Sequence, residues 1–529
     1  MHKNIRNSDV LEYHTNGRPG KIEVVPTKET KTQRDLALAY SPGVAVPCKE
    51  IEKNPEDVFK YTSKGNLVAV ISNGTAVLGL GNIGPLASKP VMEGKGLLFK
   101  IYADIDVFDI ELDANNVDDF VKIVKSLEPT FGGINLEDIK APECFEIEER
   151  LKKELKIPVM HDDQHGTAII SSAALLNAIE LQGKDIQKVK IIVSGAGASA
   201  LACCDLYIKL GAKIENFTMF DSKGMVSKQR TDLDERKSKF ANHPKSKTLE
   251  EAMKGADVFV GLSKGGILSS KMLKSMAKNP IVFALANPDP EIDYETAIKS
   301  RPDIIMATGR SDYPNQVNNV LGFPYIFRGA LDVRATTINE EMKLAAVKAL
   351  ATLAKSPVPE LVNMAYQKRN MTYGHEYIIP KPMDPRLLPV ISLAVAKAAV
   401  KSKVATNIIK DWKSYEEELQ NRLGNNDNIL RVIINKAKQH KQRVVFADAE
   451  NYKTLKAAQI VRDEGIAIPI LLGNVKKIKS LIKSNNLDLK DVEIIDPKSD
   501  EFEDKRSEYG EIYFKKGNGK ELNHKKAKK

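Results

Sequence analysis

The chain has 529 residues, of which 42% are hydrophobic and 28% charged, a balance typical of globular domains and unlike that of disordered or fibrous proteins. At about 150 residues per domain, this length predicts roughly three domains. The net charge is +10 and only 6% of the residues are aromatic. Because no zinc-finger or RNP-type signature accompanies the basic residues, we expect a solvated basic tail in "NHKKAKK" and no nucleic-acid partner.

The cysteines and the apolar runs indicate the compartment. Cys48, Cys144, Cys203 and Cys204 form no CxxC pair, which is typical of free thiols in a reducing environment. No apolar run reaches the length of a membrane span, and the N-terminus lacks the apolar core of a signal peptide. We therefore predict a cytoplasmic protein with no membrane partner.

Residues 1–160 are predicted to form a first α/β domain. The runs "LVAVI" (67–71) and "AVLGL" (76–80) have the composition of buried strands. Lys95 stands between two glycines in "VMEGKGLLFK". It is either a surface lysine in a tight turn or a base beside a divalent cation, whose charge would lower its pKa. Tyr40, before Ser-Pro-Gly, is either a packing residue or a functional hydroxyl.

An acidic pair, Glu137–Asp138, stands in "FGGINLEDIKAPECF". Adjacent carboxylates usually belong to a solvated turn. Here the neighbours Ile134, Leu136 and Ile139 are apolar, so we expect at least one carboxylate to lie close to a core.

A second acidic pair, Asp162–Asp163, stands in "HDDQHGTA" between the apolar run "LKIPVM" and a stretch of helical length. The run predicts a strand, and the helix is predicted to begin near Gly166. One aspartate is then either a helix cap or part of a site at the carboxyl end of a strand. With Glu137–Asp138, this pair offers hard oxygen ligands that suit Mg²⁺ or Mn²⁺, whereas zinc would use His161 and His165.

Residues 161–405 alternate strand and helix patterns and predict a doubly wound, Rossmann-type NAD(P)-binding domain. The apolar run 189–193 leads into "SGAGASA", a helix follows, and a second strand ends in an acid about 20 residues later. Glycine allows the tight turn and the close approach of the pyrophosphate to the helix N-terminus. The predicted cofactor-binding residues are Gly195, Ala196, Gly197, Ala198 and Asp221.

The choice of cofactor is open on charge alone. A carboxylate at Asp221 favours the free 2′-hydroxyl of NAD. Lys223, Lys228 and Arg230 follow closely enough to offset it. Asn287 in "FALANPDPE" and Asn319 in "NQVNNVLGFP" are expected in loops after strands, either in Asx turns or as neutral donors to a carboxylate or carboxamide.

Residues 425–529 form a third predicted segment. The stretch "QRVVFADAENYKTLKAAQIVRDEGIAIPILLGN" follows a strand–helix–strand pattern. The segment then continues into charged sequence.

Seven motifs stand in order along residues 15–400: "YSPGVAVPC", "GNIGPLASKPVMEGKGLLFK", "FGGINLEDIKAPECF", "HDDQHGTA", "SGAGASA", "ANPDPE" and "NQVNNVLGFP". With them the chain resembles the malic enzymes of the short bacterial type. The larger animal enzymes carry an arginine before "GLG"; here Thr75 stands in that stretch and the partner of the malate carboxylate is unassigned.

The resemblance implies oxidative decarboxylation of malate to pyruvate and CO₂ with NADP (NAD is possible), Mg²⁺ or Mn²⁺, and a homo-oligomer. It assigns the metal ligands to Glu137, Asp138 and Asp163. The base is assigned to Lys95 and the proton donor to Tyr40. Asn287 is implied to contact the substrate and the cofactor, and Asn319 is implied to contact the substrate. Asp162 is expected to lie within reach of Lys95 and to orient the neighbouring side chains.

The last segment resembles the start of a phosphate acetyltransferase domain without its later, catalytic part. Acyl transfer is therefore not expected, and binding of an acyl-CoA regulator is open. Two alternatives to a malic enzyme are a dehydrogenase of another hydroxy or amino acid and a non-catalytic acyl-CoA- or nucleotide-sensing protein.

Overall fold

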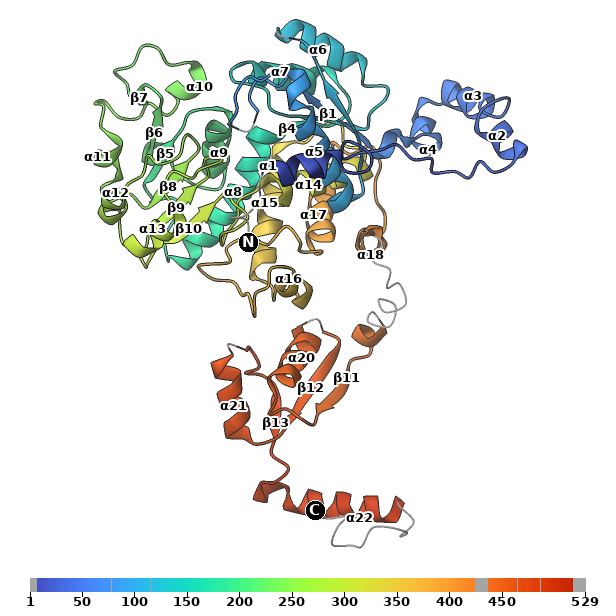
Figure 1. The fold of residues 1–529 in the computed structure, drawn as a ribbon, viewed down its shortest axis with the longest axis vertical. Helices are drawn as coiled ribbons and strands as arrows, with labels where there is room; N and C mark the ends of the chain where they lie inside the picture. The colour runs from blue at the N-terminus through green and yellow to red at the C-terminus, as the bar shows by residue number, and fades with distance from the viewer. Residues whose placement is uncertain are drawn as a thin grey trace. The chain divides into compact units, whose positions relative to one another are not determined.

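The structure, a computed structural model, describes residues 7–77, 79–114, 116–423, 436–463, 465–485 and 487–516. The chain divides into two compact units, one of residues 1–356 and 373–423 and the other of residues 357–372 and 424–529. Figure 1 shows the ribbon of both. Among the described helices, none combines the length and the apolar composition needed to cross a bilayer.

The first unit contains two sheets. The first is fully parallel, in the order β2-β1-β3-β4. Its strands are β1 (Leu67–Ser72), β2 (Asp106–Glu111), β3 (Gly133–Leu136) and β4 (Val159–His161). Every residue of β1, β3 and β4 is buried, which explains their continuous apolar sequences, because parallel strands are covered on both faces. The predicted strand at 67–71 is confirmed.

The predicted strand at 76–80 is wrong. Its described residues form a loop in which Val77 makes only an isolated bridge with Gly81, and Leu80 is exposed; residue 78 lies outside the described residues. Gly79 and Gly81 have φ values of 77° and 79°. These left-handed conformations end an extended ladder, so the glycines outweigh the apolar composition.

The second sheet of this unit has the order β10-β9-β8-β5-β6-β7, and only β7 is antiparallel. Its strands are β5 (Ile191–Ser194), β6 (Phe217–Asp221), β7 (Gly224–Met225), β8 (Val258–Gly261), β9 (Ile281–Ala284) and β10 (Ile305–Thr308). The chain runs from β5 to β6 on one side and later to β8 on the other. This reversal places a binding crevice at the carboxyl end of β5, and the predicted doubly wound sheet is confirmed.

Helices cover both sheets (Figure 1). In the first half of the unit they are α1 (Asn7–Thr15), α2 (Gln33–Ala39), α3 (Ala45–Lys53), α4 (Val58–Tyr61), α5 (Pro85–Ala103), α6 (Val117–Ser126), α7 (Glu143–Glu154) and α8 (Asp162–Leu181). Next come α9 (Ala198–Lys209), α10 (Glu235–Ser238), α11 (Leu249–Met253), α12 (Ser270–Ser275) and α13 (Tyr294–Ser300). The last are η4 (Asn319–Leu321), α14 (Phe323–Asp332), α15 (Glu340–Lys355), α17 (Leu387–Lys401) and α18 (Trp412–Arg422).

Helix α8 lies at the centre of the unit and packs against α9 and α15. It begins at Asp162, four residues before the predicted start near Gly166. The two aspartates occupy its first turn, where carboxylates interact favourably with the positive end of the helix dipole. Sequence patterning missed this turn because its side chains are polar although the turn is largely buried.

Helices α2 and α3 project away from both sheets (Figure 1). No residue of either helix is buried, and Leu36, Leu38, Val44 and Val46 are all exposed. We call residues 33–53 the projecting arm. Its exposed apolar side chains are the kind that a contact with another surface covers.

The second unit has a parallel sheet in the order β11-β12-β13, and the predicted strand–helix–strand pattern is confirmed. Its elements are α16 (Glu360–Ala365), β11 (Gln442–Phe446), α20 (Tyr452–Asp463), β12 (Ala467–Leu472), α21 (Val475–Ser484), β13 (Glu493–Ile495) and α22 (Glu503–Lys516). Segment 357–372 joins it through an ion pair of Lys456 with Glu360 at 3.1 Å and a hydrogen bond from Asn370 to the carbonyl of Asn485 at 2.7 Å. Of the predicted segment 425–529, residues 425–435 and the tail after 516 lie outside the described residues.

Candidate active site

Two adjacent strands bring the acidic pairs together. Leu136, the last residue of β3, pairs with His161, the last residue of β4. Each strand is followed directly by its two carboxylates, so the pairs meet at one edge of the sheet. The backbone N–H of Asp138 donates to Asp163 Oδ2 at 2.8 Å. This bond supports the left-handed conformation of Asp138 (φ 53°), which costs a non-glycine residue about 1–3 kcal/mol.

Three of these carboxylates form a candidate metal site. One oxygen each from Glu137, Asp138 and Asp163 lie within 4.8 Å of one another. Burial raises the pKa of Glu137 well above its ordinary range; Lys95 lowers it, and the carboxylates of Asp163, Asp162 and Asp138 raise it further. A buried, all-oxygen donor set with this much negative charge fits Mg²⁺ or Mn²⁺. The described histidines join no such group, so the residues do not support zinc.

Lys95 lies beside the metal site. Its ammonium is 2.7 Å from Asp162 Oδ2 and 2.8 Å from Glu137 Oε1, and it stands over the ring of Phe323 at 4.3 Å. Burial alone lowers the pKa of Lys95, but the carboxylates of Asp162 and Glu137 outweigh burial and raise it. The surface-lysine alternative is wrong because the side chain is only 11% exposed. The predicted lowering of the pKa depends on the charge of a bound cation.

Asp162 contacts Lys95 directly, and Asn319 contacts Asp162. Asn319 donates through Nδ2 to Asp162 Oδ2 at 3.0 Å and accepts from the hydroxyl of Thr167 at 3.0 Å. The side chain of Asp162 folds back over Gly166. The structure therefore brings Asp162 to Lys95, as predicted, and places Asn319 in the same cluster as a partner of Asp162.

Gly166 leaves the space that Asp162 occupies. A Cβ built on Gly166 lies 2.0 Å from Asp162 Oδ1 and 3.1 Å from Asn319 Cγ. Gly166→Ala is expected to displace Asp162 from Lys95 and to lower kcat/KM by at least about 10-fold, because such overpacking costs about 1–3 kcal/mol. Steady-state kinetics measure the change in kcat/KM, and a thermal melt checks that the variant is folded. Gly94→Ala is the control, since its Cβ meets only Lys21 at 3.8 Å; equal kinetics for the two variants contradict the prediction.

Two polar residues of the site were missed by sequence reasoning. Asn135, on β3, donates to Glu137 Oε2 at 2.8 Å. Glu148, on α7, accepts from the backbone N–H of His161 at 3.0 Å and from His165 Nε2 at 2.9 Å. The only sequence signal for Asn135 is a polar residue inside an apolar strand.

A cleft of about 770 Å³ opens at the carboxyl end of β5. Its lining includes Gly195, Ala196, Gly197 and Asp221, four of the predicted cofactor-binding residues, together with Pro142 from the segment that follows the acidic pair. Gly195 has φ 115°, and a Cβ there would lie 2.5 Å from the carbonyl oxygen of Leu262. Ala198 is the first residue of α9, whose N-terminus is suited to a pyrophosphate.

Asp221 is neutralised by a neighbour. Its Oδ1 accepts from Arg230 at 2.7 Å and from the backbone N–H of Lys223 at 2.9 Å. Burial opposes the shift, but Arg230 and that backbone bond hold the pKa of Asp221 below its ordinary value. The expected offset of this acid by a basic residue is found at Arg230, whereas the Lys223 ammonium pairs with Asp232.

Two predicted residues lie apart from the acidic cluster. Asn287 follows β9 and lies next to the glycine loop of the first domain, since a Cβ on Gly79 would be 2.9 Å from its carbonyl oxygen. Tyr40 ends α2 on the projecting arm and is 77% exposed. Within one chain, the structure does not bring Tyr40 to Lys95.

Three family models match the chain. Residues 19–152 match "Malic enzyme, N-terminal domain", residues 164–365 match "Malic enzyme, NAD binding domain", and residues 428–529 match "Phosphate acetyl/butaryl transferase". The three matches follow the order of the three sheets.

Curated relatives and a solved structure agree with the malic enzyme matches. The chain is 54% identical over 513 residues to the NADP-dependent malic enzyme of Haemophilus influenzae, covering 96% of this chain and 68% of the relative. It is 53% identical over 495 residues to the NAD-dependent malic enzyme of Rhizobium meliloti, covering 93% and 64%. The chain thus spans about two thirds of the length of these relatives. The crystal structure of malic enzyme from Pyrococcus horikoshii is 42% identical, covers 81% of this chain and 98% of its own, and superimposes with a TM-score of 0.72.

The α/β fold class with a Rossmann-type domain and the resemblance stated from the motifs are confirmed. Glu137, Asp138, Lys95 and the dinucleotide cleft lie within the two matched domains, and Asp162 and Asp163 directly precede the second. The chain belongs to the malic enzyme family, whose members oxidise and decarboxylate malate with a nicotinamide dinucleotide and a divalent metal.

Proposed function

We propose that the acidic cluster and Lys95 catalyse the oxidative decarboxylation of malate to pyruvate and CO₂ with NADP. The observation that carries the proposal is the position of Lys95. A single buried ammonium lies within 2.8 Å of Glu137 and 2.7 Å of Asp162, beside three converging carboxylates. A base next to a cation site is what removal of a proton from a 2-hydroxy acid requires.

Glu137, Asp138 and Asp163 would hold a divalent cation, which would supply Lewis-acid charge for the oxidation of a bound 2-hydroxy acid. Lys95 accepts the hydroxyl proton as hydride leaves C2 for the nicotinamide. Asp162 and Glu137, at 2.7 Å and 2.8 Å, stabilise the ammonium that Lys95 becomes in this step. Loss of the distal carboxylate as CO₂ then leaves the enolate of pyruvate, and one proton added at C3 gives pyruvate.

The proton at C3 is proposed to come from Tyr40 of a second copy of the chain. Tyr40 stands on the projecting arm, 77% exposed, among the four exposed apolar side chains of that arm. An arm that covers these side chains on another copy would also deliver a phenol to that copy's active site. We therefore propose a homo-oligomer whose sites each contain Lys95 of one chain and Tyr40 of another.

NADP is favoured over NAD by the pairing of Asp221. A bare carboxylate at this position repels a 2′-phosphate, and Arg230 at 2.7 Å removes that repulsion. Lys237 and Lys264 line the same cleft; Lys237 pairs with Asp234 at 3.7 Å, and Lys264 adds positive charge. The four free cysteines are consistent with a cytoplasmic location.

A spectrophotometric assay with malate tests the proposal. Cofactor reduction with release of CO₂ is expected with NADP and Mn²⁺, is expected to be weaker with NAD, and is expected to fall to background with EDTA. Restoration by excess Mn²⁺ is the control for chelation. Reduction of NADP without release of CO₂ would instead indicate a dehydrogenase, and no metal-dependent reduction of either cofactor would contradict the function.

A further inference from the structure

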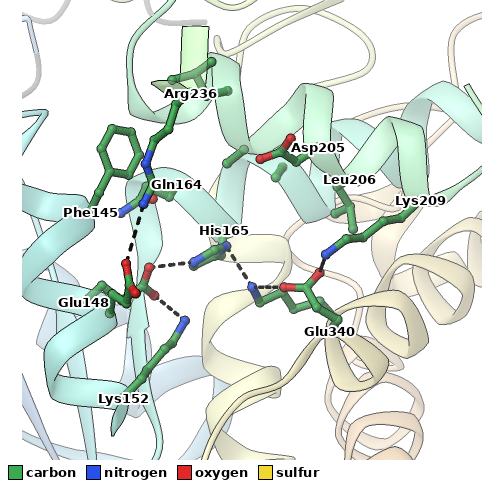
Figure 2. Close-up of a pocket in the computed structure, with 15 residues that line it drawn as sticks. Phe145, Glu148, Lys152, Gln164, His165, Asp205, Leu206, Lys209, Arg236 and Glu340 are labelled. Atoms are coloured by element: carbon green, nitrogen blue, oxygen red, sulfur yellow. Dashed lines mark hydrogen bonds and ion pairs between the residues drawn. The ribbon is translucent and has the colours of Figure 1, made fainter. Parts of the chain in front are cut away.

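A buried polar network lies behind the turn that carries Asp162 and Asp163. Figure 2 shows it along a cavity of about 270 Å³ lined by α7, α8, α9 and α15. Its centre is Glu148 of α7, whose side chain is only 9% exposed. One oxygen of Glu148 accepts from the backbone N–H of His161 at 3.0 Å and from Lys152 at 2.7 Å. The other accepts from His165 Nε2 at 2.9 Å.

The network continues from His165 into the dinucleotide-binding domain. The ammonium of Lys343, on α15, donates to His165 Nδ1 at 3.0 Å and to Glu340 at 2.7 Å. Because a lysine can only donate, Nδ1 accepts, and the proton of the imidazole is on Nε2, facing Glu148. Lys209, the last residue of α9, completes the series with an ion pair to Glu340 at 2.5 Å (Figure 2).

These contacts fix both sides of the metal-ligand turn. His161 and His165 flank Asp162 and Asp163, and both are bonded to the one carboxylate of Glu148. The backbone of Asp163 is held on a third side, since its carbonyl accepts from the hydroxyl of Ser199 at 2.7 Å. With these restraints the turn has little freedom to move Asp163 away from Glu137 and Asp138.

We propose that Glu148 is a positioning residue for the metal ligand Asp163, and that Lys343 fixes the tautomer of His165 so that Glu148 keeps both of its contacts. The inference rests on the proposed metal site. It gives the imidazole of His165 a role without metal ligation, whereas His161 contributes only its backbone N–H. It also joins the first domain to the ends of α9 and α15. Partners of this kind, one contact behind the ligands, typically change metal affinity 10- to 100-fold when they are replaced.

Glu148→Gln tests the positioning role, because glutamine is isosteric and still accepts from His161, while its amide faces the N–H of His165. In a Mn²⁺ titration followed by electron paramagnetic resonance, without malate or NADP, the Kd of the variant is expected to rise at least about 10-fold over the parent. Glu149→Gln is the matched control: Glu149 is the next residue on α7, pairs with Lys153 at the surface, and is expected to leave the Kd unchanged. The titration is run well below the melting temperature of each variant.

Lys343→Met provides a second, independent test, and it decides the question if Glu148→Gln does not fold. It leaves Glu148 in place but removes the donor to His165 Nδ1, so the Kd for Mn²⁺ is expected to rise in the same direction. A parent protein that binds no Mn²⁺ would contradict the proposed function. A parent that binds Mn²⁺ while both folded variants match its Kd within twofold would contradict only the positioning role.

Discussion

Replacing Lys95 with alanine is expected to lower kcat for malate oxidation by about 10³-fold or more, since loss of a positioned general base removes about 10²–10⁴-fold. Lys95 is the one cation within ion-pair distance of Glu137 and Asp162 among the described residues. Its removal also leaves two buried carboxylates unpaired. The measurement is the rate of NADP reduction at saturating malate and Mn²⁺, with NADP binding followed separately by fluorescence.

Lys89→Ala is the control for Lys95→Ala. Lys89 lies on the same helix, is partly exposed, and pairs with Asp109 away from the acidic cluster. We expect it to retain activity close to that of the parent. Near-normal turnover by Lys95→Ala, with Lys89→Ala unaffected, would remove Lys95 from the mechanism.

Mixing two inactive variants, Lys95→Ala and Tyr40→Phe, is expected to restore activity. If the projecting arm delivers Tyr40 to a second copy, one site of each mixed dimer contains an intact Lys95 and an intact Tyr40. Random exchange makes about half of the dimers mixed, and one of their two sites is intact, so about a quarter of the parent activity is expected. The rate of pyruvate release is measured before and after subunit exchange under mild denaturant.

Each variant incubated alone under the same conditions is the control for exchange. Tyr61→Phe, on the neighbouring helix α4, controls for loss of an exposed phenol and is expected to be active. No gain on mixing, although mass spectrometry detects mixed dimers, would show that each chain supplies its own proton donor.

Local patterns of the chain predicted the strands and the cofactor loop well. Residues 67–71 and 191–193 are continuous apolar runs, and the glycines after β5 mark a turn that few other residues adopt. The strand predicted at 76–80 failed because composition alone does not register the positive φ of Gly79 and Gly81. The start of α8 was placed too late for a related reason, since buried polar residues have no hydrophobic period.

The sequence named the carboxylates and the lysine that the structure brings together, but only part of their geometry could be predicted. Carboxylates after two strands could be expected to meet only if the strands are neighbours, and the pairing of β3 with β4 is a property of the whole sheet. The contacts of Glu148 with His161 and His165 could not be foreseen, because an acid within a charged helix usually faces solvent. The proposed place of Tyr40 in the active site of a second copy could not be predicted either, since a motif does not tell which copy of a chain it serves.

The pairing of β3 with β4 has a consequence for how this site is inherited. The two strands are joined by α7, the helix that carries Glu148, so residues 133–165 form one uninterrupted strand–helix–strand piece. All three proposed metal ligands and the carboxylate behind them are encoded within it. Recombination or duplication can therefore transfer the ligand set whole, and a protein engineer who moves this piece to another parallel sheet moves the three proposed ligands together with Glu148.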